Sequence, residues 1–179
     1  MASHPHIINL SELAWEKING PAGSPFGGER KRVGVKIGAL KLGYSFFNVA
    51  PGKTAFPYHT HTGNEEMIYV IGGAATLRFG SDELEVTAGD VIACPPGSDY
   101  PHQLINTGAS DLTYLVVSTM DYPDISQYPD SNKIGAYATP TGGQAQGFRA
   151  LYLRDKNVAY YDGEDGKEVT RTLNRRNAP

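Results

Sequence analysis

Residues 67–93 read MIYVIGGAATLRFGSDELEVTAGDVIA and consist of short apolar runs separated by turns that contain glycine. Runs of this length, rich in β-branched and aromatic residues, are typical of strands, and glycine pairs mark tight turns. The expected strands are Met67–Ile71, Ala74–Arg78, Glu83–Val86 and Asp90–Ala93. This pattern predicts antiparallel strands rather than packed helices.

The same pattern continues on both sides of this stretch, from Val33 to about Thr119. The further expected strands are Val33–Ile37, Gly43–Val49, Ala55–His59, His102–Asn106 and Leu112–Ser118. Short strands at this spacing predict an all-β sandwich or barrel, and the length of 179 residues fits one domain. We therefore expect an N-terminal arm at residues 1–32, a barrel at residues 33–119 and a C-terminal extension at residues 120–179.

The two ends of the chain have weaker patterns. One short helix is expected at Asn9–Ile18, with Asn9 as its N-cap. Residues 121–147 contain repeated prolines and glycines, which predict irregular structure. Ala150–Leu153 and Val158–Tyr161 resemble a hairpin that covers a sheet edge or reaches a partner subunit. The polar tail after Gly163 is expected to be mobile.

The chain has five histidines, and two of them form the pair His59-Thr60-His61 on an expected strand. Side chains alternate along a strand, so both imidazoles lie on one face and can begin a metal site. A turn after His61 can bring the carboxylate of Glu66 beside them. The pair at His4 and His6 has the same spacing but lies in the terminal arm, where an exposed, non-functional role is expected.

Two longer segments give this pair a context. Residues 51–73, PGKTAFPYHTHTGNEEMIYVIGG, contain a glycine, the His-x-His pair, a glutamate and a strand that ends in glycine. Residues 89–106, GDVIACPPGSDYPHQLIN, contain a glycine, Pro-x-Gly, a histidine and an asparagine four residues later. In this order the segments resemble the two signatures of the cupin superfamily, across residues 43–118. The resemblance implies a double-stranded β-helix, or jelly-roll barrel, of the single-barrel type.

The resemblance also implies a set of metal ligands: His59, His61, Glu66 and His102. Glu66 is preferred to Glu65 because it lies three residues before a tyrosine, in the Glu-x-x-Tyr-Val arrangement that the family favours. Three imidazoles and a carboxylate suit one divalent transition metal ion, whether Fe, Mn, Ni, Zn or Cu. Such an ion polarises bound oxygen groups, activates bound water or takes part in redox chemistry.

Candidates for the lining of a substrate pocket follow from counting along the strands with a period of two. Ile68 and Val70 share the face of Glu66, and Leu104 and Asn106 share the face of His102. Aromatic and basic side chains near the motifs complete the candidate set: Tyr58, Arg78 and Tyr100. The only cysteine, Cys94, is expected to be buried packing rather than a nucleophile.

The expected function is that of a metal-dependent enzyme acting on a small polar metabolite, of the dioxygenase or the isomerase or lyase type. The alternative is a non-catalytic metal-containing protein that binds or senses a small molecule. A sugar-phosphate enzyme has weak support, because the signature strands supply only Lys53 and Arg78 as cations. No catalytic residue beyond the metal ligands is assigned.

Composition restricts the other classes. The net charge is −3, and basic residues cluster only at residues 30–32 and 171–176, where solvated arms are expected, so no nucleic-acid partner is indicated. No apolar run is long enough to cross a membrane, and no signal peptide is evident. One cysteine agrees with a reducing compartment, so a cytoplasmic location is expected. The resemblance further implies a homodimer.

Overall fold

The computed structural model of the protein describes residues 4–138 and 148–176. Its strands, in chain order, are β1 (Glu16–Asn19), β2 (Gly27–Arg32), β3 (Leu42–Val49), β4 (Thr60–His61), β5 (Glu66–Gly72), β6 (Ala74–Phe79), β7 (Asp82–Thr87), β8 (Val91–Cys94), β9 (His102–Ile105), β10 (Leu112–Thr119), β11 (Asp124–Tyr128), β12 (Lys133–Ala138) and β13 (Phe148–Leu153). The helices are short 3-10 turns at Leu10–Glu12, Gly34–Lys36 and Pro129–Ser131, and α1 (Lys167–Arg176).

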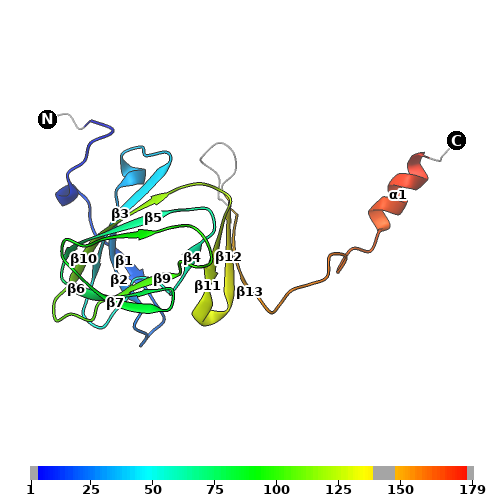
Figure 1. Ribbon diagram of the computed structural model, residues 1–179. Coiled ribbons are helices and arrows are strands. Elements are labelled where there is room, and N and C mark those ends of the chain that lie inside the picture. The colour runs from blue at the N-terminus through cyan, green and yellow to red at the C-terminus, as the bar shows by residue number, and fades with distance from the viewer. Residues whose placement is uncertain (1–3, 139–147, 177–179) are drawn as a thin grey trace.

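The strands form antiparallel sheets that wrap around a common interior (Figure 1). One sheet has the order β1-β2-β3-β10-β5-β8, a second has β7-β6-β9, and a third has β13-β12-β11-β4. Strands that are distant in sequence, such as β3 and β10, lie next to each other, as in a jelly-roll. The expected all-β fold of the jelly-roll type is therefore confirmed.

The hydrophobic core lies between the first two sheets. Val49 is 1% exposed, and Val70 and Leu112 are fully buried at 0% exposure. Each comes from a different strand of the six-stranded sheet and points toward β6 and β9, which supply Leu77 and Leu104 to the same cluster. Burial of such side chains is worth about 1.5–3 kcal/mol each. The core thereby holds the two sheets in a fixed relation around the interior.

The turn between β5 and β6 depends on a glycine. Gly73 has a φ of +87°, in the left-handed region, and a Cβ atom at this position would lie 2.6 Å from the carbonyl oxygen of Asp111. Only glycine fits both the backbone conformation and the close approach. The glycine pair in the sequence thus marks the turn as expected.

Most expected barrel strands are confirmed with small shifts at their ends, including those that became β3, β5, β6, β7, β8, β9 and β10. The strand expected at Val33–Ile37 is wrong, because Gly34–Lys36 forms a 3-10 turn there. The place beside β3 is already taken by β2, which leaves that segment no strand to pair with. The strand expected at Ala55–His59 is replaced by the short strand β4, one residue further on.

The N-terminal region also differs from expectation. Asn9 does cap a helix, since its side chain accepts a hydrogen bond from the backbone N–H of Ser11 at 2.9 Å. The helix ends after one turn, however, and Glu16–Asn19 forms β1 instead of continuing it. Strands β1 and β2 extend the six-stranded sheet from β3. The polar sequence of β2, GGERKR, carries no strand pattern, so only the pairing with β3 reveals it.

The C-terminal region is more regular than the sequence indicates. Within the stretch expected to be irregular, β11 and β12 form a hairpin, while residues 139–147 lie outside the described part of the chain. The expected pairing of Ala150–Leu153 with Val158–Tyr161 is wrong. Phe148–Leu153 pairs with β12, because β12 presents a free edge, and residues 158–161 are exposed. The division of the chain at residues 32 and 119 stays a prediction.

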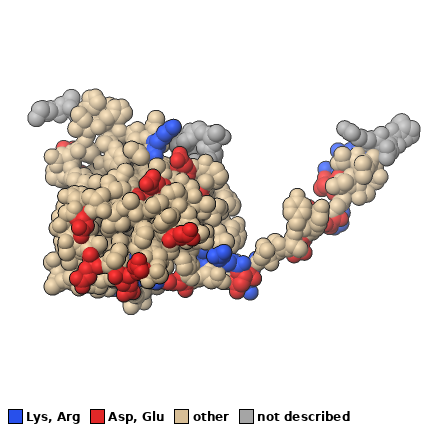
Figure 2. All heavy atoms as spheres, viewed as in Figure 1, with Lys and Arg blue, Asp and Glu red and all other residues tan. Residues whose placement is uncertain are grey.

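The chain after β13 leads away from the barrel to α1, as Figure 1 shows. Acidic side chains are dispersed over the barrel face in Figure 2, and acidic and basic side chains both occur along this C-terminal segment. Among the described residues, no helix has the length and apolar character needed to cross a bilayer.

Candidate metal centre

His59 and His102 lie on neighbouring antiparallel segments that are joined by a β-bridge. The backbone N–H of His59 donates to the carbonyl of His102 at 3.1 Å, and the N–H of His102 donates back at 2.7 Å. This pairing brings the two rings together, with centroids 4.8 Å apart. His61 lies two residues after His59, and its ring centroid is 5.2 Å from that of His59. The expected alternation therefore places the His-x-His pair on one face.

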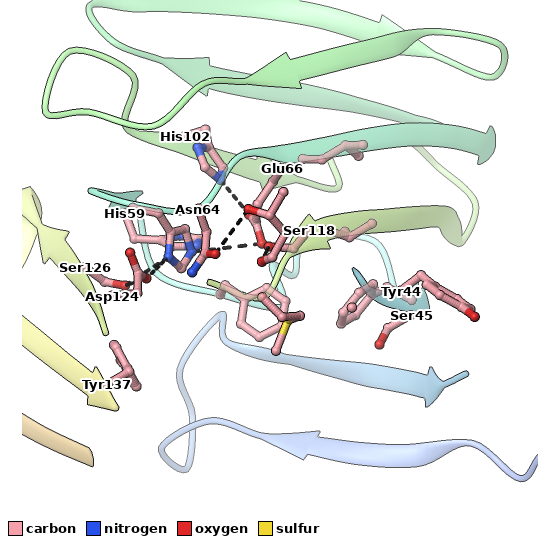
Figure 3. A pocket seen from close by; sticks show the side chains of 18 of the residues that line it. Tyr44, Ser45, His59, Asn64, Glu66, His102, Ser118, Asp124, Ser126 and Tyr137 are labelled. Carbon is pink, nitrogen blue, oxygen red and sulfur yellow. Dashed lines mark hydrogen bonds and ion pairs between the residues drawn. The ribbon is translucent and has the colours of Figure 1, made fainter. Parts of the chain in front are cut away.

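Glu66 begins β5 and completes the cluster shown in Figure 3. Possible ligand atoms of His59, His61 and Glu66 all lie within 4.8 Å of one another, so these three residues are placed to hold a metal ion. The Nε2 atom of His102 lies 3.1 Å from Oε2 of Glu66. Glu65, the competing carboxylate, is exposed and is not part of the cluster.

Each imidazole has an oxygen acceptor at its Nδ1 atom. The carbonyl of Pro57 lies 2.8 Å from Nδ1 of His59, and the carbonyl of Tyr100 lies 3.1 Å from Nδ1 of His102. A carbonyl oxygen can only accept, so the proton is on Nδ1 in both rings. The Nε2 atoms are thereby assigned to the interior, where a neutral imidazole offers its lone pair to a metal.

Asp124 is the acceptor at Nδ1 of His61. Its Oδ2 atom accepts from Nδ1 of His61 at 2.6 Å, and its Oδ1 atom accepts from the backbone N–H of Gly63 at 3.0 Å. Asp124 is 2% exposed and begins β11, which pairs with β4 through Ser126 and His61. The strand pairing therefore places a buried carboxylate behind the second histidine.

Burial sets the protonation of His59. Removal from water, with a smaller contribution from the neighbouring His102, lowers the pKa of His59 to about 4. His59 is consequently neutral at pH 7. Neutrality is the state in which an imidazole binds a metal ion.

Glu66 and His102 form a buried ion pair when no metal separates them. Burial acts to lower the pKa of His102, but the neighbouring Cys94 and Glu66 outweigh it and raise this pKa to about 10. Burial acts to raise the pKa of Glu66. The hydrogen bond from His102 and the nearby imidazoles outweigh burial and lower this pKa below its usual value. His102 therefore carries a proton on Nε2 that a metal ion would displace.

The cluster lies in the wall of a cavity of about 540 Å³. Apolar side chains such as Phe47, Ile68 and Leu104 form part of the lining. Figure 3 shows Tyr137 on the same side of the cluster as Asp124 and Ser126, and Tyr44 and Ser45 on the other side. The centre thus faces a space large enough for a small molecule.

The residues proposed from the sequence as pocket lining divide into two groups. Ile68 and Leu104 line the cavity. The structure places the other candidates elsewhere: Tyr58, Val70, Arg78, Tyr100 and Asn106. Val70 and Asn106 do point inward, at 0% exposure, but they pack in the core beyond the cavity.

The remaining three of these candidates do not line the cavity, although Tyr58 is buried at 6% exposure. The guanidinium of Arg78 is bound by Asp130 at 2.7 Å and covers the ring of Tyr58 at 4.1 Å. Tyr100 is 39% exposed and packs beside Phe79. Nearness to a motif in sequence did not predict direction: Arg78 lies on the outer face of β6, and Tyr58 and Tyr100 lie in the segments that precede β4 and β9.

Sequence reasoning missed the contribution of the C-terminal extension. Asp124, Ser126 and Tyr128 from β11 line the cavity, as do Tyr137 from β12 and Arg149 from β13. The polar residues at positions 124, 126 and 128 alternate with a period of two, and this is the signal that could have indicated a strand with a functional face. Cys94 is buried and free, as expected.

Comparison with known families agrees with this geometry. Residues 45–118 match the family model described as "Cupin domain", the region that contains the four clustered residues. Residues 45–118 form a cupin domain. Family membership and the placement of His59, His61 and Glu66 together agree with a metal-binding cupin.

Several solved structures are similar to this protein in fold. A sugar phosphate isomerase of the cupin superfamily from Silicibacter pomeroyi is 23% identical, with 87% of this chain and 98% of that chain covered and a TM-score of 0.71. A protein from Acidithiobacillus ferrooxidans, provisionally named a sugar phosphate isomerase, is 22% identical, with 87% and 96% covered and a TM-score of 0.73. The comparison with curated proteins found no match.

A third similar structure belongs to a protein with a different named activity. The polyketide cyclase RemF from Streptomyces resistomycificus is 23% identical, with 69% of this chain and 84% of that chain covered and a TM-score of 0.55. At these identities the likeness concerns the fold. Proteins with this barrel therefore have more than one named activity, and the function of this protein has to be inferred from its site.

Proposed function

We propose that this cupin is a metal-dependent enzyme that acts on a small polar metabolite, by a reaction of the dioxygenase or the isomerase or lyase type. Its metal ion is divalent and is held by His59, His61, Glu66 and His102. One observation carries the proposal: Nδ1 of each of the three imidazoles has an oxygen acceptor, which directs their Nε2 atoms toward Glu66.

The donor set fits such an ion. Neutral imidazoles and a carboxylate suit Fe, Mn, Ni, Zn and Cu ions, and four ligands leave room for a substrate or water. When bound, the metal supplies a Lewis acid for an oxygen group of the substrate or a centre for redox chemistry. The buried position of Asp124 behind His61 keeps that ring oriented, as acceptors behind metal-bound histidines commonly do.

Metal analysis of the protein purified without added metal tests the first half of this proposal. We expect close to one transition-metal ion per chain in the wild type and a loss of most of it in Glu66→Gln. The matched control is Glu65→Gln, because Glu65 is the adjacent carboxylate and is exposed. Equal loss from both variants, or a wild type that retains no metal, would contradict the proposed site.

Turnover tests the second half. Oxygen uptake with small acids, thiols and phenols examines the dioxygenase type, and product analysis with polyols and sugars examines the isomerase or lyase type. We expect turnover in one of these series that disappears in His59→Ala. Tight metal binding with no turnover in either series would assign the protein to small-molecule binding or sensing instead.

We also propose that the protein is a cytoplasmic homodimer. The edge strand β13 exposes large apolar side chains, including Phe148 at 58% and Tyr152 at 55%, and an open apolar edge favours pairing with a second chain. Cys94, the single cysteine, is a buried free thiol, which supports a reducing compartment. Light scattering at micromolar concentration should give twice the chain mass, and a monomer would refute the dimer.

A further inference from the structure

Among the described residues that line the cavity, Arg149 has no ionic partner. The charged residues that line it, other than the histidines, are Arg32, Glu66, Asp124 and Arg149. Arg32 is paired with Glu16 at 2.9 Å, Glu66 with His102, and Asp124 with His61. Among the described residues no carboxylate lies within salt-bridge distance of Arg149, and residues 139–147, beside it in sequence, contain no Asp or Glu.

The sheet directs Arg149 into the cavity. Arg149 on β13 is the cross-strand partner of Tyr137 on β12, and its guanidinium carbon lies 5.5 Å from the centre of the Tyr137 ring. Side chains of cross-strand partners share a face, and both Tyr137, labelled near Asp124 and Ser126 in Figure 3, and Arg149 line the cavity. The aromatic face supports the guanidinium, while its N–H groups stay available to a ligand.

Two tyrosines connect Arg149 to the metal centre. The hydroxyls of Tyr137 and Tyr128 lie 2.7 Å apart, and the ring of Tyr128 is stacked on that of His59 at 6.1 Å. Two hydroxyls that bond to each other use one proton between them, so the other remains for an external acceptor. A ligand between Arg149 and the metal centre thus meets a guanidinium and a hydroxyl donor on the same wall.

The charge balance of the cavity favours an anion. A divalent metal ion would be neutralised by the two carboxylates of Glu66 and Asp124, and the guanidinium of Arg149 would leave the cavity positive. Guanidinium groups match the planar, two-oxygen geometry of carboxylates and phosphates, which accept two parallel hydrogen bonds. A neutral polyol would leave these donors without a charged partner.

We propose that Arg149, Tyr137 and Tyr128 form an anion subsite beside the metal centre, which binds the carboxylate or phosphate group of the substrate. The inference rests on the proposed metal-dependent function, and it specifies the substrate class of that site as a small oxyacid. The metal takes one oxygen group of the substrate, and Arg149 takes the anionic group.

Calorimetric titration of the zinc-loaded protein tests this subsite with three probes: inorganic phosphate, succinate and the neutral polyol erythritol. We expect Arg149→Met to weaken binding of at least one of the two anions by roughly ten- to one-hundredfold, the effect of a lost charge-assisted hydrogen-bond pair. Arg149→Lys retains the charge but not the two parallel hydrogen bonds, so its anion affinity should lie between those of the wild type and Arg149→Met. Any binding of erythritol should be the same in wild type and variants.

The matched control is Arg154→Met, because Arg154 is exposed, follows β13 directly and contacts Gln127 outside the cavity lining. This variant should bind both anions as the wild type does. A selective loss of phosphate binding identifies a phosphate group, and a selective loss of succinate binding identifies a carboxylate. Affinities of Arg149→Met within twofold of the wild type for both anions would overturn the subsite.

Metal content and melting temperature of the same samples separate this inference from the proposed function. Arg149→Met should retain its metal and its melting temperature, because the side chain is exposed and belongs to an edge strand. If the wild type held no metal, the proposed function would fail. The comparison of Arg149→Met with Arg154→Met in the metal-free protein would still decide the subsite.

Discussion

Nδ1 of His61 lies 2.6 Å from Oδ2 of Asp124, although the two residues are 63 positions apart in the chain. The contact joins the His-x-His segment of the barrel to the C-terminal extension. Asp124 also accepts from the backbone of Gly63, so the carboxylate is held from two sides. The extension consequently contributes a residue to the candidate metal centre.

Asp124→Asn should therefore weaken metal binding without abolishing the fold. The amide oxygen accepts a weaker hydrogen bond from Nδ1 of His61 than the carboxylate does. The His61 ring is then less firmly oriented and less basic. Loss of such an acceptor usually costs roughly 10- to 100-fold in metal affinity. Competition with a chromophoric chelator measures the change, and Asp130→Asn, which removes an exposed carboxylate bound to Arg78, should leave the affinity unchanged. Equal affinities of Asp124→Asn and wild type would contradict the role of Asp124.

The stability of the metal-free protein should decrease in acid because of His59. An unfolded histidine takes up its proton near pH 6.5, whereas His59 in the folded protein does so only near pH 4. Between these values the unfolded state binds more protons, so the free energy of unfolding falls as the pH falls. Urea unfolding in the presence of a chelator measures this, and His59→Asn should flatten the decrease between pH 6.5 and 4.

His102 should act in the opposite direction on the alkaline side. Its pKa in the folded protein is raised to about 10, so the stabilisation it contributes is fully present below pH 6.5 and is lost as the pH rises to about 10. The same urea series, continued to pH 10, should show this loss in the metal-free wild type. His102→Asn should remove the alkaline decrease, and a decrease of the same size in that variant would assign it to other groups.

Metal binding should release a proton at neutral pH. In the metal-free protein His102 is protonated at pH 7.5 and shares its Nε2 proton with Glu66, and a metal ion has to displace that proton to reach the same nitrogen. Titration of zinc in buffers with different ionisation enthalpies should give about one proton released per ion. No dependence of the measured heat on the buffer would show that His102 is not a ligand.

Asn106→Ala should destabilise the protein rather than change its ligand. The Asn106 amide donates to the carbonyls of Val49 at 2.7 Å and Ser110 at 2.9 Å, and its oxygen accepts from the N–H of Gly108. Truncation leaves these buried groups without partners, at a cost of about 1–3 kcal/mol each. Thermal unfolding should show a lower melting temperature, while metal content below that temperature stays at the wild-type level. Thr107→Ala, at an exposed neighbour, is the control.

Much of the barrel could be predicted from local sequence. The strands between Gly43 and Thr119 have alternating or apolar runs and are separated by glycine turns, and such signals depend on neighbouring residues alone. The same is true of the His-x-His pair, because two imidazoles spaced by one residue on an extended chain share a face. The pattern predicts that His59 and His61 share a face, and the resemblance to the cupin signatures is what selected them, with Glu66, as candidate ligands.

The strands that the sequence does not predict depend on contacts between distant residues. The polar strand β2 exists because β3 offers an edge, and Phe148–Leu153 pairs with β12 rather than with the later segment for the same reason. Strand pairing between segments that are far apart leaves little trace in composition. Proximity to a motif also fails to predict direction for Arg78, which is bound to Asp130, and for Tyr100, which lies in the loop before β9.

The sequence by itself predicted the β architecture from short-range alternation, and its resemblance to the cupin signatures supplied the candidate metal ligands. Only the tertiary structure decided what surrounds the metal centre. Asp124, Tyr128, Tyr137 and Arg149 reach the cavity because β11, β12 and β13 pair with one another and with β4. Hydrogen bonds between distant strands set that arrangement, and they determine which donors a ligand meets beside the metal.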